Sequence, residues 1–194
     1  MRIGLFGGTF DPLHIGHLLI AEVVRGDFPL DRVMFIPAAI SPHKVGYDLS
    51  PPEVRLEMVQ CAIERDDGFE VSDVEIRNNN ISYTVDTIKW FRAEEKWRNE
   101  ELYLIIGSDS FFELNTWKNP EMILQQVHVL VVNRPGFDIQ NAEQQYRDRI
   151  TVINGPLLDV SSSDIRERVR LGKSIRYRVP ECVEKIIFQK GLYR

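Results

Sequence analysis

Two histidines in the N-terminal stretch have a spacing that could do phosphate chemistry. His14 and His17 follow the run Gly7-Gly8-Thr9-Phe10-Asp11-Pro12-Leu13. The chain has only four histidines among 194 residues, so half of them fall in this one turn. Residues three apart on a helical turn share a face, and both imidazoles are therefore expected to point at one spot. We interpret that spot as a phosphate site.

The residues before the histidines favour close approach of an anion to the backbone. Gly7 and Gly8 end a short apolar run typical of a buried first strand. Glycine lets the chain turn sharply and lets a ligand approach the main chain. Thr9 and Phe10 continue toward a helix predicted over 18–25, whose first N–H groups could hold an anion. A glycine pair after a strand is common, so the prediction depends on the whole string in its strand–turn–helix context.

A second pattern of the same kind lies near the C-terminus. The stretch Asp159-Val160-Ser161-Ser162-Ser163-Asp164-Ile165-Arg166 has serines at a predicted helix start and an arginine one turn later. Serine hydroxyls can simply cap the first N–H groups. Together with the planar fork of donors on Arg166, they could also bind phosphate oxygens. The pairing with the first motif favours the phosphate site.

The elements that must position these residues alternate between strand and helix. Strands are predicted over 1–6, 32–36, 69–76 (one or two strands), 102–107, 128–132 and 150–153. Helices are predicted over 18–25, from a Ser50 cap through 63, over 82–97, 120–126, 161–171 and 180–191, and a long loop over 37–50. This alternation predicts an α/β fold, a Rossmann-like doubly wound parallel sheet with helices on both faces. Ligands then bind beyond the carboxyl ends of the strands, where residues 7–17, 37–44, 107–117 and 133–136 fall.

Composition restricts the class of protein. A hydrophobic fraction of 43% and a net charge of −5 are typical of a globular protein that is not a general nucleic-acid binder. We expect a single domain over 1–194, with 161–194 as closing helices. Two distant cysteines, Cys61 and Cys182, and the lack of a signal-like or membrane-spanning stretch predict a cytoplasmic protein with reduced thiols. The oligomeric state is open, with a homodimer as one option.

Two apparent nucleotide motifs are decoys. Gly172-Lys173-Ser174 resembles the end of a P-loop, but Glu167 stands where the motif requires glycine. Gly4, Gly7 and Gly8 do not have the Gly-x-Gly-x-x-Gly spacing of dehydrogenases. A dinucleotide bound in the dehydrogenase manner is therefore not expected.

Residues 7–17 resemble the His-x-Gly-His signature of the nucleotidylyltransferase superfamily, and their lead-in is similar to that of the bacterial nicotinate-mononucleotide adenylyltransferases. Residues 159–166 resemble the family's Ile-Ser-Ser-Thr-x-x-Arg element, with Val160 for Ile and Ser163 for Thr. The resemblance runs from Met1 to about Arg166. It implies transfer of AMP from ATP to nicotinate mononucleotide, giving nicotinate adenine dinucleotide and pyrophosphate in NAD biosynthesis. It also implies Mg²⁺, which arrives largely through ATP. The chain has no Cys/His cluster with zinc spacing, so we expect no fixed metal site.

The resemblance assigns roles to individual residues. The implied catalytic residues are His14, His17, Lys44 and Arg166. Those implied to bind ATP are Gly7, Gly8, Thr9, Phe10, His17, Gly107, Asp109, Ser161, Ser162 and Arg166. Those implied to bind nicotinate mononucleotide are Thr9, Lys44, Tyr83, Thr84, Trp117 and Arg134. Thr84 lies at a predicted helix start, which suits a carboxylate, and Trp117 could stack on the pyridine ring at a gain of about 1–3 kcal/mol.

Other interpretations stay open from the sequence. Lys44 could be a solvated loop lysine, and Trp117 a core residue. Pantetheine-phosphate adenylyltransferases and cytidylyltransferases share the His-x-Gly-His core. Trp117, the Thr84 region, the paired glycines and His14 favour the pyridine-nucleotide branch. A non-catalytic nucleotide sensor is the alternative from another class, and a pyrophosphate turnover assay separates it from an enzyme.

Overall fold

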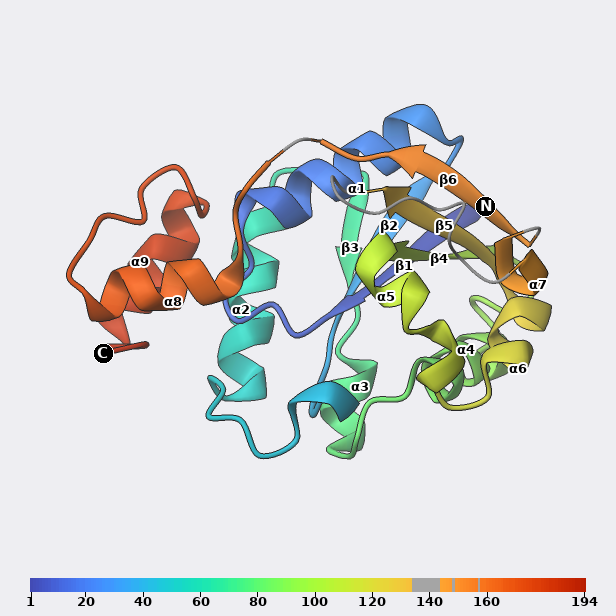
Figure 1. The fold of residues 1–194 in the computed structure, drawn as a ribbon, viewed down its shortest axis with the longest axis horizontal. Helices are drawn as coiled ribbons and strands as arrows, with labels where there is room; N and C mark the ends of the chain where they lie inside the picture. The colour runs from blue at the N-terminus through green and yellow to red at the C-terminus, as the bar shows by residue number, and fades with distance from the viewer. Residues whose placement is uncertain (134–143, 148, 157) are drawn as a thin grey trace.

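The protein is described here from a computed structural model, which covers residues 1–133, 144–147, 149–156 and 158–194 (Figure 1). Within these residues, six parallel strands form one sheet in the order β3-β2-β1-β4-β5-β6. The strands are β1 (Arg2–Gly8), β2 (Arg32–Pro37), β3 (Phe69–Val71), β4 (Glu101–Gly107), β5 (His128–Asn133) and β6 (Ile150–Asn154). The strand order reverses direction between β1 and β4, as in doubly wound folds. The predicted fold class is confirmed.

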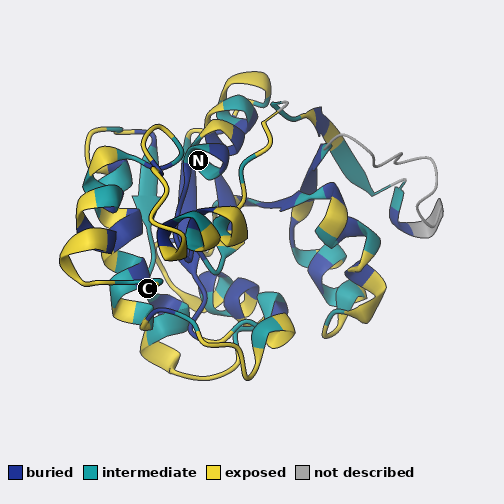
Figure 2. Cartoon of the chain, turned by 60° about the vertical axis from the view of Figure 1, so that its left-hand side comes forward, coloured by how far each residue is buried: buried dark blue, intermediate teal, exposed yellow. Residues whose placement is uncertain are grey.

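Helices cover both faces of the sheet (Figures 1 and 2). The α-helices of the described residues are α1 (Ile15–Asp27), α2 (Pro52–Ile63), α3 (Val74–Asn78), α4 (Thr84–Ala93), α5 (Ser108–Phe112), α6 (Pro120–Gln126), α7 (Gln144–Arg147), α8 (Ser162–Arg170) and α9 (Glu181–Gln189). Two 3₁₀ turns are η1 (Pro42–Lys44) and η2 (Leu114–Thr116). In this part of the chain, no helix combines the length and the apolar character needed to cross a membrane.

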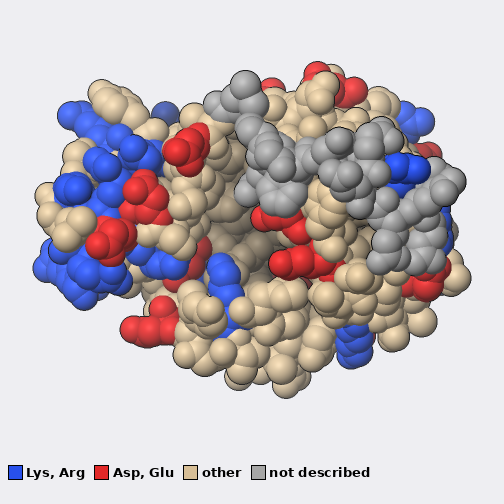
Figure 3. All heavy atoms as spheres, viewed as in Figure 1, with Lys and Arg blue, Asp and Glu red and all other residues tan. Residues whose placement is uncertain are grey.

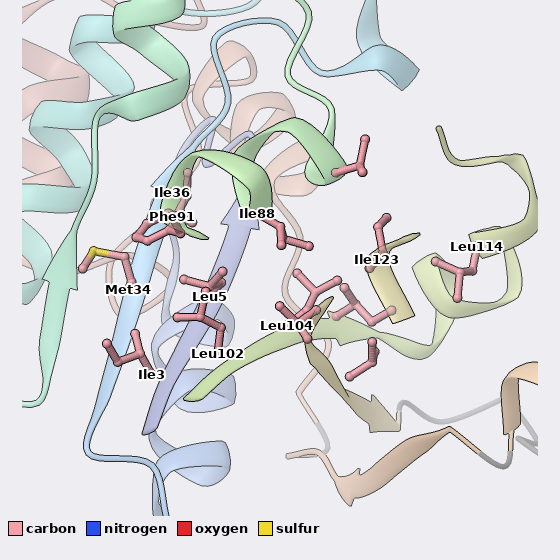
Figure 4. Close-up of a cluster of buried hydrophobic side chains, with 14 of the residues drawn as sticks. Ile3, Leu5, Met34, Ile36, Ile88, Phe91, Leu102, Leu104, Leu114 and Ile123 are labelled. Carbon is pink, nitrogen blue, oxygen red and sulfur yellow. The ribbon is translucent and has the colours of Figure 1, made fainter. Parts of the chain in front are cut away.

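Alternation along β1 divides the core between the two faces. Ile3 and Leu5 join a buried cluster with side chains of α4 and α6, such as Ile88 and Ile123 (Figure 4). Phe6 lies in the other cluster, against α1 and α2. Gly4 points to that second face, where an added Cβ would lie 2.7 Å from a side-chain atom of Ile105. A core on both faces of the sheet thus supports the strand ends that carry the candidate site.

The helices α8 and α9 form a third cluster with α2 rather than with the sheet. Ile165, Val183 and Ile187 are buried there against Met58 of α2. The C-terminal helices therefore lie beside α2, at one end of the molecule in Figure 1.

Three local predictions were wrong. The stretch 69–76 is strand only over Phe69–Val71, because the backbone turns at Asp73 and α3 begins at Val74. The predicted helix over 82–97 ends at Ala93, because Glu94 is extended.

The predicted cap at Ser50 is wrong as well. Pro51 precedes α2 and no side chain caps that helix. Ser50 is buried, and its backbone bonds to Asp11 and Arg55 instead.

Candidate active site

A cavity of about 310 Å³ lies at the carboxyl ends of the central strands. Gly7 and Gly8 at the end of β1 and Gly107 at the end of β4 line it. Figure 3 shows the molecule hollowed near the centre of this face. Among the predicted site residues, the cavity also contacts Thr9, Phe10, His17, Tyr83, Thr84, Asp109 and Trp117. The structure thus brings most of the predicted binding residues to one place, at the topological switch point of the sheet.

The two motif histidines stack on each other at the start of α1. Their ring centroids are 3.7 Å apart with 27° between the planes, and His14 is buried. The backbone N–H of His14 donates to Nδ1 of His17 over 3.2 Å. Because that nitrogen is an acceptor, a neutral His17 carries its proton on Nε2. His17 lines the cavity and is therefore equipped to donate a hydrogen bond into it.

The glycines of the motif make room for neighbouring groups. An added Cβ at Gly16 would lie 3.0 Å from two atoms of the His14 ring, so a larger residue at this position would press on that ring. An added Cβ at Gly8 would lie 2.8 Å from the ring of Phe10. At Gly7 it would meet nothing within 4 Å, which leaves open space beside the cavity.

A buried arginine that the sequence analysis did not single out holds the motif loop in place. Arg55 of α2 is 1% exposed. Its guanidinium donates to four backbone carbonyl groups, on Ser50, Thr9, Ala38 and Ala39, over 2.6–3.0 Å. Burial lowers the pKa of Arg55. Thr9 follows β1, while Ala38 and Ala39 follow β2. Arg55 thus fastens together the two loops that border the cavity.

Asp11 is a second missed residue and connects three distant parts of the chain. Its Oδ1 accepts from the Tyr193 hydroxyl over 2.6 Å, and its Oδ2 accepts from the Ser50 N–H over 3.3 Å. Its backbone carbonyl accepts from Nη1 of Arg166 over 2.7 Å. Burial and the Asp11 carboxylate raise the pKa of Tyr193, so its hydroxyl stays a donor.

The C-terminal motif docks on the N-terminal motif. Ser162 donates through its hydroxyl to the Pro12 carbonyl over 2.9 Å, next to the Arg166 contact with Asp11. Ser161 caps α8 by accepting from the Asp164 N–H over 3.1 Å. Ser161, Ser162 and Arg166 do not line the cavity itself. The two motifs are thus in direct contact, while their binding of ATP remains a prediction.

Lys44 ends the 3₁₀ turn η1 and is half-buried. Burial lowers its pKa, and the positive charge of Arg166 lowers it further, with Asp11 acting in the opposite direction. Two cations that repel each other in the free protein would both be stabilised by an anion between them. His43, which precedes Lys44, lines the cavity, although the sequence analysis did not assign it a role.

The far side of the cavity is formed by α4 and by the residues after η2. Tyr83 precedes the first residue of α4, Thr84, as predicted. Trp117 packs against the core cluster with part of its surface and also lines the cavity. Its indole Nε1 is buried and has no hydrogen-bond partner among the described residues. Arg134, the remaining predicted contact, lies outside the described residues.

The described residues contain no group of three or more His, Cys, Asp or Glu side chains placed to hold a metal ion. Asp109 lines the cavity in the first turn of α5, where it could meet a nucleotide or its counter-ion.

Comparison with known proteins agrees with this geometry. Residues 5–168 match the family described as cytidylyltransferase-like. The chain belongs to this family. A probable nicotinate-nucleotide adenylyltransferase of Desulfitobacterium hafniense strain Y51 is 46% identical over 200 residues, covering 100% of this chain and 96% of the relative. That of Moorella thermoacetica is 42% identical over 200 residues, covering 100% and 92%. Within the cytidylyltransferase-like family, the chain therefore falls in the nicotinate-nucleotide adenylyltransferase branch.

Two solved structures have the same fold as this chain. The Plasmodium falciparum nicotinic acid mononucleotide adenylyltransferase complexed with NaAD superimposes with a TM-score of 0.81 at 19% identity, covering 99% of this chain and 97% of that one. The same enzyme complexed with APC gives a TM-score of 0.79 at 18% identity, covering 99% and 96%. At this identity the match concerns the fold, and it supports the Rossmann-like nucleotidylyltransferase architecture.

Proposed function

We propose that this chain transfers AMP from ATP to nicotinate mononucleotide, giving nicotinate adenine dinucleotide and pyrophosphate. The observation that carries the proposal is the stacked pair His14–His17 beside a cavity at the strand ends. Its full-length relatives named for this activity support the choice of substrates. A cytoplasmic location is part of the proposal, and the two free cysteines are consistent with it.

The reaction is a displacement at phosphorus. An oxygen of the mononucleotide 5′-phosphate forms a bond to the α-phosphorus of ATP, and the bond from that phosphorus to the pyrophosphate oxygen breaks. The attacking oxygen is already anionic at neutral pH, so the chain does not need a general base. It must align the two phosphates and stabilise the charge that builds between them.

His17 is assigned the hydrogen bond to the phosphate oxygens, because it lines the cavity and its Nδ1 accepts from the His14 N–H, which leaves Nε2 as the donor nitrogen of the neutral ring. His14 is buried against it and holds the ring by stacking. Lys44 and Arg166 supply positive charge for the phosphates. A divalent ion, Mg²⁺ in this proposal, would come with ATP and would offset the negative charge of its phosphates.

The two halves of the cavity are assigned to the two substrates. Gly7, Gly8, Gly107 and Asp109 at the strand ends border the ATP side. Trp117 is assigned the stacking contact with the pyridine ring. The first turn of α4, at Tyr83 and Thr84, is assigned its carboxylate. Arg134 remains a proposed contact to the mononucleotide.

The test is pyrophosphate release with ATP and Mg²⁺ while nicotinate mononucleotide, nicotinamide mononucleotide and phosphopantetheine are offered separately. We expect turnover with the first to exceed turnover with the other two. Preference for phosphopantetheine would keep the chemistry and overturn the substrate assignment. ATP binding without turnover on any acceptor would indicate a nucleotide sensor.

A pair of histidine variants tests the assigned chemistry in the same assay. His17→Ala should lower kcat by about 10²–10³, the usual cost of one lost transition-state donor. His128→Ala is the matched control, because His128 is an exposed strand residue bonded to Thr151 and does not line the cavity. Wild-type kcat in His17→Ala would remove His17 from the mechanism.

A further inference from the structure

Lys118 carries a positive charge in the lining of the cavity. Among the described residues that line it, Lys118 is the only lysine or arginine. It follows Trp117 directly in the sequence. Its Nζ lies 4.4 Å from the centroid of the Tyr83 ring and 2.8 Å from Oδ2 of Asp86. The ammonium group therefore lies beside the first turn of α4, at Tyr83 and Asp86.

The ion pair of Lys118 with Asp86 is open to exchange. The two side chains are 44% and 48% exposed, so water screens their attraction. The lysine side chain is long and flexible, and its ammonium can be shared between two carboxylates. An anionic ligand in the cavity could thus contact Lys118 at little cost to the existing pair.

Carboxylates near Lys118 and in the lining of the cavity oppose an anionic ring substituent. Asp109 lines the cavity as well, and Asp86 lies in the first turn of α4. A carboxylate placed among these groups without a cation would meet net repulsion. Lys118 is the described side chain of the lining that can offset this repulsion.

We propose that Lys118 is a specificity-determining residue, whose ammonium group pairs with the carboxylate of the pyridine ring and thereby selects nicotinate mononucleotide over nicotinamide mononucleotide. This rests on the proposed function. The two acceptors share the ribose phosphate and the ring, so most other contacts cancel when their rates are compared. The neutral amide gains no ion pair from Lys118, and the acid does.

The test compares kcat/KM for the two mononucleotides in Lys118→Met. We expect the acid-to-amide ratio to fall by about 5- to 20-fold, between the effect of an exposed and of a partly buried charged contact. The value for the amide should stay within about twofold of wild type. Lys118→Arg keeps the charge and should retain most of the preference.

The matched control is Lys89→Met. Lys89 is an exposed lysine of α4, the helix that carries Asp86, and it does not line the cavity, so its removal should leave the ratio unchanged. An equal fall with both substrates in Lys118→Met, or no change in their ratio, would overturn the proposal. If wild-type protein turned over neither mononucleotide, the proposed function would fail instead, which is a distinct outcome.

A second variant tests the role of Lys118 by removing its ion-pair partner. Asp86→Asn removes the competing carboxylate and leaves Lys118 in place. The ratio should then rise by about two- to fivefold, and added salt should reduce the advantage of the acid. A ratio that falls or stays constant in Asp86→Asn would contradict the assigned role of Lys118.

Discussion

The hydroxyl group of Tyr193 donates a 2.6 Å hydrogen bond to Oδ1 of Asp11, across 182 positions of sequence. Asp11 lies inside the phosphate-binding motif and is 1% exposed, while Tyr193 is the residue before the last. The end of the chain therefore supports the loop at which the reaction is proposed to occur. Backbone carbonyl groups of the same loop also accept hydrogen bonds from Arg166 and Arg55.

Removal of the Tyr193 hydroxyl group should lower the free energy of unfolding. Tyr193→Phe leaves a buried carboxylate oxygen without its donor, and we expect the free energy of unfolding to fall by about 1.5–3 kcal/mol. Urea denaturation followed by circular dichroism measures this. The control is Tyr177→Phe, because Tyr177 is 83% exposed and should give a change within about 0.5 kcal/mol. Equal effects of the two variants would contradict the role given to Tyr193.

Arg55 should contribute more to the free energy of unfolding than Tyr193 does. Arg55→Met leaves the carbonyl groups of Thr9, Ala38 and Ala39 without this donor, and we expect a loss of more than about 3 kcal/mol. Arg65→Met is the control, because Arg65 is exposed after α2. Chemical denaturation of both variants gives the comparison. A loss below about 1 kcal/mol in Arg55→Met would show that the loops hold without it.

Gly16→Ala should separate activity from stability. The new Cβ would press on the His14 ring, which is 3.0 Å away, and displace the histidine pair. We expect kcat to fall at least about tenfold, because small misplacement of catalytic groups is costly. The free energy of unfolding should not fall along with kcat, since alanine is a better helix former than glycine by about 1 kcal/mol.

Gly26→Ala provides the matched control in the same helix. An added Cβ at Gly26 meets nothing within 4 Å. This variant should therefore gain stability by about 0.5–1 kcal/mol and keep wild-type kcat. If both glycine variants kept full activity, the spatial argument for Gly16 would be wrong.

Glu75 should make stability depend on pH. Burial raises the pKa of this carboxyl group, whereas the Thr87 hydroxyl, 2.5 Å away, acts against the rise. The folded protein then holds the proton more tightly than the unfolded chain, whose glutamate pKa is about 4.3. The contribution of Glu75 to stability is present below that value and is lost as pH rises through the folded-state pKa.

Glu75→Gln removes this titration and keeps a hydrogen-bond acceptor for Thr87. The free energy of unfolding of the variant, minus that of wild type, should increase as pH rises from 4 to 7. Urea midpoints at several pH values measure it. A difference that is flat or that decreases over this range would show that burial of Glu75 does not govern its titration.

The motif histidines and the fold could be predicted because their signals are local. His14 and His17 are three residues apart, and alternating strand and helix patterns determine which strand ends meet. The end of the strand before Asp73 could not be located from the sequence. The apolar residues Phe69, Val71, Val74 and Ile76 fit one continuous strand as well as a strand that ends before a helix. The side chains of α3 decide between them only through packing.

The supporting residues were missed for a different reason. Tyr193 and Asp11 are neighbours only after the chain has folded, and neither belongs to a periodic pattern that links them. Arg55 did leave a signal, since it shares a helix face with Met58 and Val59, which are fully buried. An arginine on the apolar stripe of a helix indicates a buried guanidinium with backbone partners. Ser50 was assigned to a cap because its spacing to Glu53 fits one, but its backbone is used by Arg55 and Asp11.

The most direct test of the central claim is identification of the products with purified protein, ATP, Mg²⁺ and nicotinate mononucleotide. Chromatography with mass detection should show nicotinate adenine dinucleotide and pyrophosphate forming at equal rates, and neither forming when the mononucleotide is omitted. Pyrophosphate or AMP formed without the dinucleotide would mean that the cavity directs ATP to water. That result would contradict adenylyl transfer at this site.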